Sequence, residues 1–227
     1  QDGVYLNGTK LVIKGINRHS FSVDGGRTTN AALSRMDAQL IKEMNMNAVR
    51  SHYPPDEHFL DMCDSLGLVY MDELAGWQNS YDSKVGAKLV KEMIERDVNH
   101  PCIILWSNGN EGGWNTQTDP LFAQYDRLQK RHMVHPWADF NELDTHHYPT
   151  YLTGVARFTN GYKVFMPTEC MPCTIREGEP VCVISGIDGA PIHCLQEDLS
   201  GSIAMKLPSA VIKEEYSIPT SQMHLTE

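Results

Sequence analysis

The stretch IILWSNGNEGGWN, residues 103–115, joins an apolar run to a polar turn that is rich in glycine and asparagine. Its first half is typical of a strand that is buried on both faces. Its second half favours a turn and ends the strand. A carboxylate, Glu111, stands in this turn, where burial would cost free energy unless the charge is paired or used. We therefore treat Glu111 as a candidate functional residue at the carboxyl end of a buried strand.

The sequence around this stretch alternates between strand patterns and helix patterns. Helical spacing of apolar residues occurs in the segments 29–46, 56–67, 87–101 and 119–131. Apolar runs that are typical of strands occupy 47–54, 68–73, 102–108, 133–140, 144–148 and 163–169. This alternation predicts right-handed βαβ units and a parallel sheet, either a barrel or a doubly wound fold. At 3–16, an Asn-Gly pair between alternating residues predicts a hairpin before the first unit.

Polar side chains follow the predicted strands at each carboxyl end. These groups are Asn17-Arg18-His19, Arg50-Ser51-His52, Asp72-Glu73, Asn110-Glu111, His146-His147-Tyr148 and Thr168-Glu169. A doubly wound sheet concentrates its functional residues at one switch point, whereas a barrel collects them from many strand ends. The distribution therefore favours an incomplete (β/α)8 TIM barrel, of which about seven strands are recognisable.

The composition indicates an acidic globular chain. With 227 residues and 41% hydrophobic side chains, it can form one large domain or two small ones. A formal net charge of −10 argues against a nucleic-acid partner. No apolar run is long enough to predict a membrane span, and no signal segment is recognisable. The chain begins with Gln1 instead of an initiator Met, so we expect a processed or partial chain. We therefore assign neither a compartment, cytoplasmic or periplasmic, nor an oligomeric state.

The cysteines give little support for a metal or redox site. Only Cys170-Met-Pro-Cys173 has suitable spacing, and neither Cys182 nor Cys194 completes a second pair. We therefore expect unrelated, reduced thiols and no bound metal.

Glu169 follows an apolar strand as Glu111 does, and two carboxyl groups at barrel strand ends suit glycoside hydrolysis. One carboxyl group protonates the leaving oxygen while the other attacks the anomeric carbon or activates water. The alternative is that each Glu is a helix N-terminal residue or an ion-pair partner.

Other strand ends carry groups that suit a sugar pocket, namely planar hydrogen-bonding side chains and an aromatic face. We expect Trp106 to contribute to that face. Each histidine taken alone is equally a hydrogen-bonded rim residue, and Asn110 is equally a turn residue. Asp72-Glu73 is most simply an ion pair with Arg50. The candidate substrate-binding residues are His19, Arg50, His52, Asn110, His147 and Tyr148.

The motifs KGINRHS (14–20), NAVRSHYP (47–54), VYMDE (69–73) and ILWSNGNEGG (104–113) resemble, in this order, those of glycoside hydrolase family 2, the family of bacterial β-galactosidases. The resemblance extends from Gly3 to about Met171. It implies that Glu111 is the acid/base and Glu169 the nucleophile. It also implies that Tyr148, in THHYP, is the nucleophile's partner. His19, Arg50, His52 and Asn110 would then hold the sugar.

The activity that this resemblance implies is a retaining exo-β-glycosidase. It would hydrolyse terminal β-linked sugars, most simply β-galactosides, through a covalent glycosyl-enzyme intermediate. The alternatives are a β-glucuronidase or β-mannosidase of the same family, a catalytically inactive truncated fragment, and a non-enzymatic sugar-binding module. The expected partner is a carbohydrate substrate. Some members carry magnesium ligands shortly after the Asp-Glu pair, but here that segment reads LAGWQNSYD (74–82), so no magnesium is expected.

The two ends of the chain depart from the family pattern. Residues 1–14 are expected to be a lead-in hairpin or the end of a preceding sandwich domain, and 15–171 the catalytic barrel. Residues 172–227 show no sustained period beyond a short strand pattern at 181–184, and we assign them to a divergent tail. A shift of reading frame near Cys170–Cys173 would explain this change. Sequencing the encoding DNA tests that hypothesis, which fails if no single-base shift restores a family-like continuation.

Overall fold

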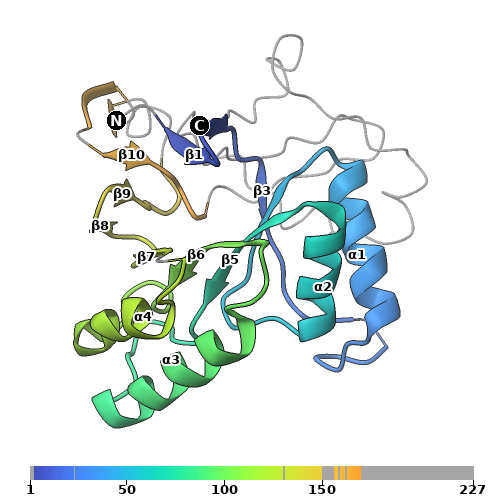
Figure 1. The fold of residues 1–227 in the computed structure, drawn as a ribbon, viewed down its shortest axis with the longest axis horizontal. Coiled ribbons are helices and arrows are strands. Elements are labelled where there is room, and N and C mark those ends of the chain that lie inside the picture. Colours follow the sequence, from blue (N-terminus) through green and yellow to red (C-terminus); the bar gives the residue numbers. More distant parts are fainter. Residues whose placement is uncertain are drawn as a thin grey trace, which may run out of the picture.

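The computed structural model describes residues 3–169 apart from 23, 130, 150–155, 158 and 162. The Cys170–Cys173 pair, the predicted strand at 181–184 and the proposed frame shift lie outside these residues. Within the described part, a parallel sheet with helices on its outer side positions the polar strand ends (Figure 1). No helix in this part is long and apolar enough to cross a bilayer.

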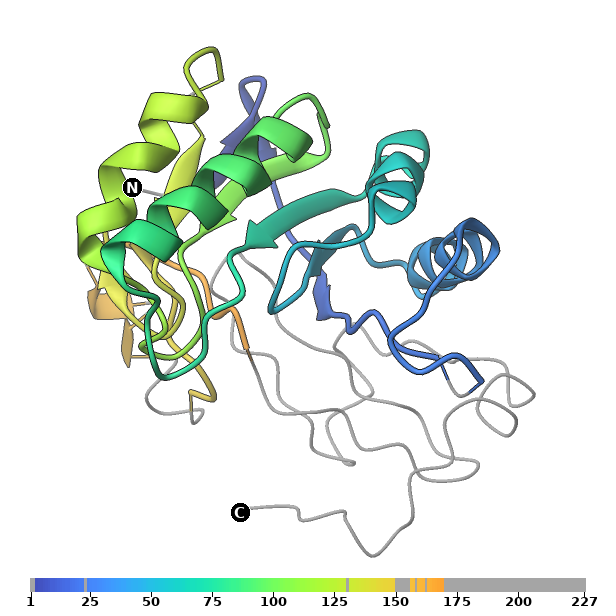
Figure 2. The same ribbon diagram turned by 90° about the horizontal axis from the view of Figure 1, so that it is seen from below.

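The main sheet contains five strands in the order β3-β4-β5-β6-β7, and all neighbouring pairs are parallel. Helices connect consecutive strands, so the carboxyl ends of all five strands meet at one edge. Figures 1 and 2 show α1 to α4 along the outer side of this sheet. The strands are β3 (Gly15–Asn17), β4 (Ala48–Arg50), β5 (Val69–Glu73), β6 (Ile103–Ser107) and β7 (His132–Val134). The helices are α1 (Ala31–Glu43), α2 (Glu57–Leu66), α3 (Ser83–Asp97) and α4 (Asp119–Tyr125), with a 3₁₀ turn η1 (Thr116–Thr118) before α4.

A second, smaller sheet continues the barrel. It contains β8 (Asp139–Phe140), β9 (Leu143–Asp144) and β10 (Val164–Phe165), and β10 runs parallel to β9. The predicted strand 133–140 is therefore interrupted, because a turn with Trp137 at a φ of 73° separates β7 from β8. With β9 and β10 following β3 to β7, the described residues form a partial TIM barrel of seven strands. The predicted fold class is confirmed.

The predicted hairpin forms ahead of the barrel strands. β1 (Val4–Leu6) and β2 (Thr9–Leu11) pair antiparallel around Asn7 and Gly8, whose φ values are 51° and 78°. Two consecutive left-handed residues are what a two-residue hairpin turn requires. Val4 packs against the inner core of the barrel, so the hairpin is attached to it through apolar contact.

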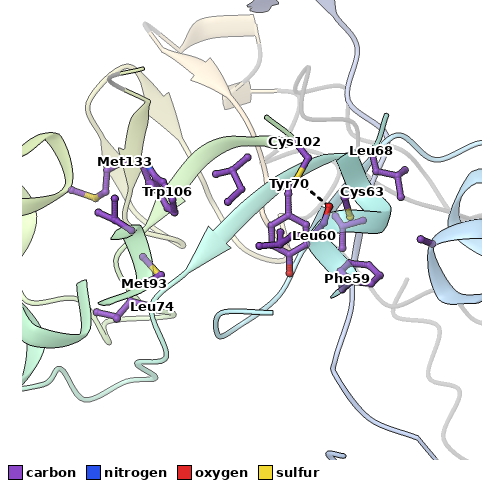
Figure 3. Packing of buried hydrophobic residues seen from close by; sticks show 14 of the residues in the cluster. Phe59, Leu60, Cys63, Leu68, Tyr70, Leu74, Met93, Cys102, Trp106 and Met133 are labelled. Atoms are coloured by element: carbon purple, nitrogen blue, oxygen red, sulfur yellow. Dashed lines mark hydrogen bonds between the residues drawn. The ribbon is translucent and has the colours of Figure 1, made fainter. Parts of the chain in front are cut away.

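Two apolar clusters hold the sheet from its two faces. The outer cluster fills the space between the sheet and the helices, and Figure 3 shows Tyr70 and Trp106 within it. The inner cluster is formed by Met71, Leu105, Val134, Leu143, Val164 and Met166. Tyr70 and Met71 are consecutive on β5 and point to opposite faces, as the strand period requires. Both faces of the strands are therefore buried, which explains their continuous apolar sequence.

Capping residues decide where the helices begin and end. The side chain of Asp82 accepts hydrogen bonds from the backbone N–H groups of Lys84 and Val85, so α3 starts before the predicted residue 87. Gly67 ends α2 in the left-handed conformation with a φ of 65°. On α1, the buried residues are Ser34, Ala38 and Ile41, whereas Met36, an apolar residue of the predicted helical segment 29–46, is 43% exposed. Small side chains thus form much of the face that packs.

Asp72, the next-to-last residue of β5, is a buried carboxyl group that faces Asp97 of α3. It is fully buried, and no hydrogen bond within the described residues reaches either of its oxygens. Burial raises its pKa well above the ordinary value, and the nearby carboxylate of Asp97 raises it further. Protonated Asp72 can donate a hydrogen bond to Asp97, which is held by Arg96 at 2.6 Å. The prediction that Asp72 belongs to the Arg50 ion pair is therefore wrong, since Arg50 contacts Glu73 instead.

We expect Asp72→Asn to make unfolding less dependent on pH. Asp72 has a raised pKa in the folded state, so its stabilising effect is complete below an unfolded-state pKa of about 4. As pH rises from there toward the folded pKa, wild-type stability falls by about 1.4 kcal/mol per pH unit. Asparagine keeps the donor to Asp97 and has no proton to lose. Urea unfolding at several pH values should therefore show that the free energy of unfolding of Asp72→Asn increases relative to that of the wild type as pH rises. The exposed control Asp61→Asn should show no such relative increase. Parallel pH curves for all three proteins would contradict this assignment.

Candidate active site

A pocket of about 500 Å³ lies at the edge where the parallel strands end. The residues that line it come from the segments after β3, β4, β5 and β6 and from the segments that carry Tyr148 and Glu169. They are His19, His52, Tyr53, Ala75, Gly76, Trp77, Asn110, Glu111, Tyr148 and Glu169. Six of the eight predicted site residues are therefore in the pocket lining, namely His19, His52, Asn110, Glu111, Tyr148 and Glu169. Arg50 and His147 lie behind the lining, and the structure places both against the carboxylates.

Glu111 and Glu169 approach each other across this pocket. One oxygen of each carboxyl group and a ring nitrogen of His147 lie within 4.8 Å of one another. His147 Nδ1 is 3.2 Å from Glu111 Oε1 and 3.7 Å from Glu169 Oε2. Two residues that are far apart in sequence therefore form one pair of neighbouring carboxyl groups.

Glu169 is held by three side chains. Arg50 Nη1 donates to its Oε1 at 2.8 Å, His52 Nε2 lies 3.2 Å from the same oxygen, and the Tyr148 hydroxyl donates to Oε2. Burial raises the pKa of Glu169, but the hydrogen bonds from Tyr148 and Arg50, together with the positive charge of Arg50, outweigh burial and lower it below the ordinary value. Glu169 is therefore an ionised, oriented carboxylate at neutral pH.

Arg50 is occupied by protein groups and has no N–H left for a ligand. Its Nε and Nη2 donate to the two oxygens of Glu73 at 2.8 Å and 3.0 Å, which confirms the predicted Arg50–Glu73 ion pair. Nη2 also donates to Asn110 Oδ1 at 2.8 Å, and Nη1 donates to Glu169 Oε1 and Asn17 Oδ1. An arginine has five N–H donors, so all are engaged. Arg50 thus orients Glu169 and Asn110, where the sequence predicted contact with a substrate.

Asn110 lines the pocket with one end of its amide already fixed. Because Oδ1 accepts the hydrogen bond from Arg50, the amide NH₂ is the end that can donate to a ligand. Glu111, the next residue, has a φ of 45°, which is uncommon for a residue with a side chain. Gly112 follows with a φ of 92°, a conformation that favours glycine. The glycines of the turn therefore allow the strained backbone that carries Glu111 into the pocket.

Three rings form the wall on the β3–β4 side. The rings of His19 and His52 are stacked, with centroids 5.1 Å apart, and the Tyr53 hydroxyl lies 3.1 Å from His19 Nδ1. Burial and the positive charge of Arg50 lower the pKa of His52 to about 4, so it is neutral at pH 7. The sequence reasoning missed Tyr53, although its position directly after His52 at a strand end could have indicated it.

His147 links the two carboxyl groups from behind the pocket. Burial and Arg50 lower its pKa to about 4, so its ring is neutral at pH 7 and has one N–H. Thr168 Oγ1 lies 2.8 Å from His147 Nε2 and donates its own hydrogen to the carbonyl of Thr145 at 3.3 Å. Nε2 therefore carries the proton, and Nδ1 is an acceptor that faces Glu111. Nδ1 lies 3.2 Å from Glu111 Oε1.

The aromatic face of the pocket comes from a different tryptophan than expected. Trp106 is completely buried in the outer cluster, and its Nε1 donates to Asp126 at 2.9 Å. The predicted contribution of Trp106 to the pocket is therefore wrong, because its side chain points to the helical face of β6. Trp77 lines the pocket instead, is 65% exposed, and donates from Nε1 to Glu111 Oε2 at 3.0 Å. Its position in the loop after Asp72-Glu73 was the available signal.

The side chains around Glu111 do not fit the magnesium site found in some relatives of this family pattern. Mg²⁺ prefers oxygen ligands in octahedral geometry. In the loop after β5, Trp77 instead directs an N–H group at Glu111. The oxygens of Glu169 are already engaged by Arg50, His52 and Tyr148.

The sequence matches one protein family over most of its length. Residues 1–159 match the family described as "Glycosyl hydrolases family 2, TIM barrel domain". The chain is 47% identical over 110 residues to a β-galactosidase of Thermoanaerobacterium thermosulfurigenes, a match that covers 46% of this chain and 15% of that protein. It is 35% identical over 147 residues to a β-galactosidase of Pectobacterium atrosepticum, covering 57% of this chain and 14% of that protein. The chain thus spans about one seventh of the length of these relatives.

Solved structures resemble the fold. A β-glucuronidase of Faecalibacterium prausnitzii matches with a TM-score of 0.64 and 27% identity, covering 77% of this chain and 37% of that chain. A β-glucuronidase of Parabacteroides merdae matches with a TM-score of 0.66 and 20% identity, covering 74% of this chain and 25% of that chain. The second likeness concerns the fold alone.

Proposed function

The chain belongs to glycosyl hydrolase family 2, and from this premise we propose that it is the catalytic barrel of a retaining β-galactosidase. It would hydrolyse terminal β-linked galactose through a covalent glycosyl-enzyme intermediate. We also propose that the barrel domain begins near residue 15, where β3 starts, and continues to about residue 171.

The observation that carries this proposal is the short separation of the two carboxyl groups. Oxygens of Glu111 and Glu169 lie within 4.8 Å of each other. Retaining glycosidases have carboxyl groups about 5–5.5 Å apart, whereas inverting enzymes need about 6.5–9.5 Å to admit a water molecule. The short distance supports direct attack by one carboxylate on the sugar.

The different surroundings of the two glutamates support different roles. Arg50 and Tyr148 lower the pKa of Glu169 and orient it, which suits a nucleophile. Glu111 has neutral His147 as an acceptor beside Oε1, which suits a carboxyl group that carries a proton.

The reaction then proceeds in two steps. In the first, a Glu169 oxygen forms a bond to the anomeric carbon, the glycosidic bond breaks, and Glu111 gives its proton to the leaving oxygen. In the second, Glu111 takes a proton from water while the water oxygen bonds to the anomeric carbon and the ester to Glu169 breaks. Two inversions give net retention. The amide of Asn110, fixed by Arg50, is available to donate to a sugar hydroxyl throughout.

The charge of the pocket favours a neutral sugar over a uronic acid. Among its described lining residues there is no lysine or arginine, and Arg50 behind them has no free N–H. His52 is neutral at pH 7 because its pKa is lowered to about 4. A glucuronate carboxylate would gain no ion pair from these groups. A galactoside carries no charge, so hydrogen bonds from the side chains of the pocket lining are sufficient to bind it.

Hydrolysis of aryl β-galactoside, β-glucuronide and β-mannoside tests the proposal. We expect the galactoside to be cleaved with kcat/KM at least about tenfold above the others, because leaving one buried polar group without its partner costs about 1–3 kcal/mol. Proton NMR should detect β-galactose as the first product. An α-anomer formed first would contradict retention.

The same assay separates the alternatives. Faster cleavage of the glucuronide or mannoside would overturn the sugar assignment. Galactoside binding without turnover, unaffected by Glu111→Gln and Glu169→Gln, would indicate a sugar-binding module. Neither binding nor turnover would indicate an inactive fragment.

A further inference from the structure

We infer that Trp77 is a positioning residue for Glu111 and that its exposed face forms the leaving-group side of the pocket. This inference rests on the proposed function and deepens it. The substrates that it favours are β-glycosides whose leaving group is aromatic or is itself a sugar ring.

The first observation is the contact itself. Trp77 Nε1 donates to Glu111 Oε2 at 3.0 Å, although 65% of Trp77 is exposed. A large aromatic side chain at the surface normally gains free energy by burial. Here one edge is tied to the predicted acid/base while the rest faces the pocket.

The second observation is that the backbone holds the two residues together. Asn110 N–H donates to the carbonyl of Gly76 at 2.6 Å, and Gln78 N–H donates to the carbonyl of Asn110 at 3.2 Å. The residues on both sides of Trp77 are thus bonded to the residue before Glu111. These bonds fix the loop after β5 against the loop after β6.

Two glycines make this close approach possible. A Cβ on Gly76 would lie 2.5 Å from the carbonyl oxygen of Gly113, and a Cβ on Gly113 would lie 2.3 Å from the carbonyl carbon of Gly76. Any side chain at either position would push the loops apart. The absence of side chains at both positions therefore allows the two loops to approach closely enough for the indole to reach Glu111.

The hydrogen bond determines which oxygen of Glu111 holds the proton. Oε2 accepts from the Trp77 N–H group, so the acid proton belongs on Oε1. Oε1 is the oxygen that faces His147 Nδ1 at 3.2 Å. Trp77 on one side and His147 on the other thus aim the carboxyl group, which is how a positioned acid gains its catalytic effect.

The location of Trp77 places its exposed indole face on the leaving-group side of the pocket. Glu111 protonates the oxygen that departs with the leaving group, so the leaving group lies beside Glu111 on the side away from Glu169. Trp77 and Glu111 both line the pocket, and the indole is bonded to Oε2 while Oε1 faces His147. An indole face stacks well on aromatic rings and on the apolar faces of sugars.

Kinetics with leaving groups of different acidity test this role. In Trp77→Phe, which keeps an aromatic ring and removes the N–H group, we expect kcat/KM for an alkyl β-galactoside to fall by about 10- to 100-fold. For a dinitrophenyl β-galactoside, whose departure needs no proton, the change should stay within about threefold. Trp77→Ala should in addition raise KM for aryl galactosides. Trp114→Phe is the matched control, because Trp114 stacks on His135 and is not among the residues that line the pocket. Equal losses for both substrates in Trp77→Phe would overturn the positioning role.

Fluorescence tests the contact without turnover. Glu111→Leu removes the acceptor of the Trp77 N–H group, so it should shift the emission of Trp77. The shift should persist in a Trp114→Phe background and be absent in a Trp77→Phe background. A shift that survives in the Trp77→Phe background would overturn the inference. The expected shift in a chain that hydrolyses none of the three glycosides would overturn the proposed function and leave the contact standing.

Discussion

Replacing Glu169 with alanine is expected to lower kcat for an aryl β-galactoside by at least about 10⁴-fold. Losses of this size are typical when the nucleophile of a hydrolase, or the base that activates it, is removed. Glu169 is the carboxylate whose pKa is lowered, through Tyr148 and Arg50, and it is the only one of the pair bonded to Arg50. Without it, the anomeric carbon has no ionised group on its reacting face. Steady-state rates of the purified variant measure this effect, with the exposed Glu92→Ala on α3 as the control.

Azide distinguishes the two glutamates. In Glu169→Ala, azide can enter the space of the lost carboxylate and should restore turnover, giving a glycosyl azide of inverted, α configuration. In Glu111→Ala, azide should act only after the glycosyl-enzyme has formed and should give the β-azide. Formation of the α-azide by Glu111→Ala would exchange the two roles.

Replacing Arg50 with methionine is expected to impair both folding and activity. The change leaves the buried carboxylates of Glu73 and Glu169 without their cation, and breaking such a pair typically costs about 3–5 kcal/mol. Because Arg50 lowers the pKa of Glu169, its loss should also move the acidic limb of the kcat/KM profile to higher pH. Urea unfolding and the pH profile measure the two effects. The surface control Lys88→Met, on α3, should change stability by no more than about 0.5 kcal/mol.

A second substitution separates stability from catalysis. In Arg50→Met/Glu73→Leu the unpaired charge of Glu73 is gone, so much of the lost stability should return. Activity should stay low, because Glu169 and Asn110 still lack their donor. Full recovery of activity in the double variant would contradict a positioning role for Arg50.

Local sequence was sufficient for most of the elements and for the fold class, because each signal acts within a few residues. The Asn7-Gly8 turn, the end of α2 at Gly67 and the apolar strands buried on both faces depend on local signals and appear where predicted. Because parallel strands end at one edge, the sequence also indicated that Glu111 and Glu169 would meet there. Their residue types and strand-end positions were readable, and their separation was not.

The tertiary structure decided which side chain faces which partner. The structure shows Arg50 supporting Glu169, where the sequence predicted a sugar contact, because four neighbouring side chains accept hydrogen bonds from its N–H groups. Trp106 points to the helices, and Trp77 reaches Glu111 only because Gly76 and Gly113 bring two loops into backbone contact. The sequence by itself determined the order of elements and the carboxylates at their ends. The closure of the sheet and the packing between loops, which join residues remote in the chain, determined the distances on which the chemistry depends.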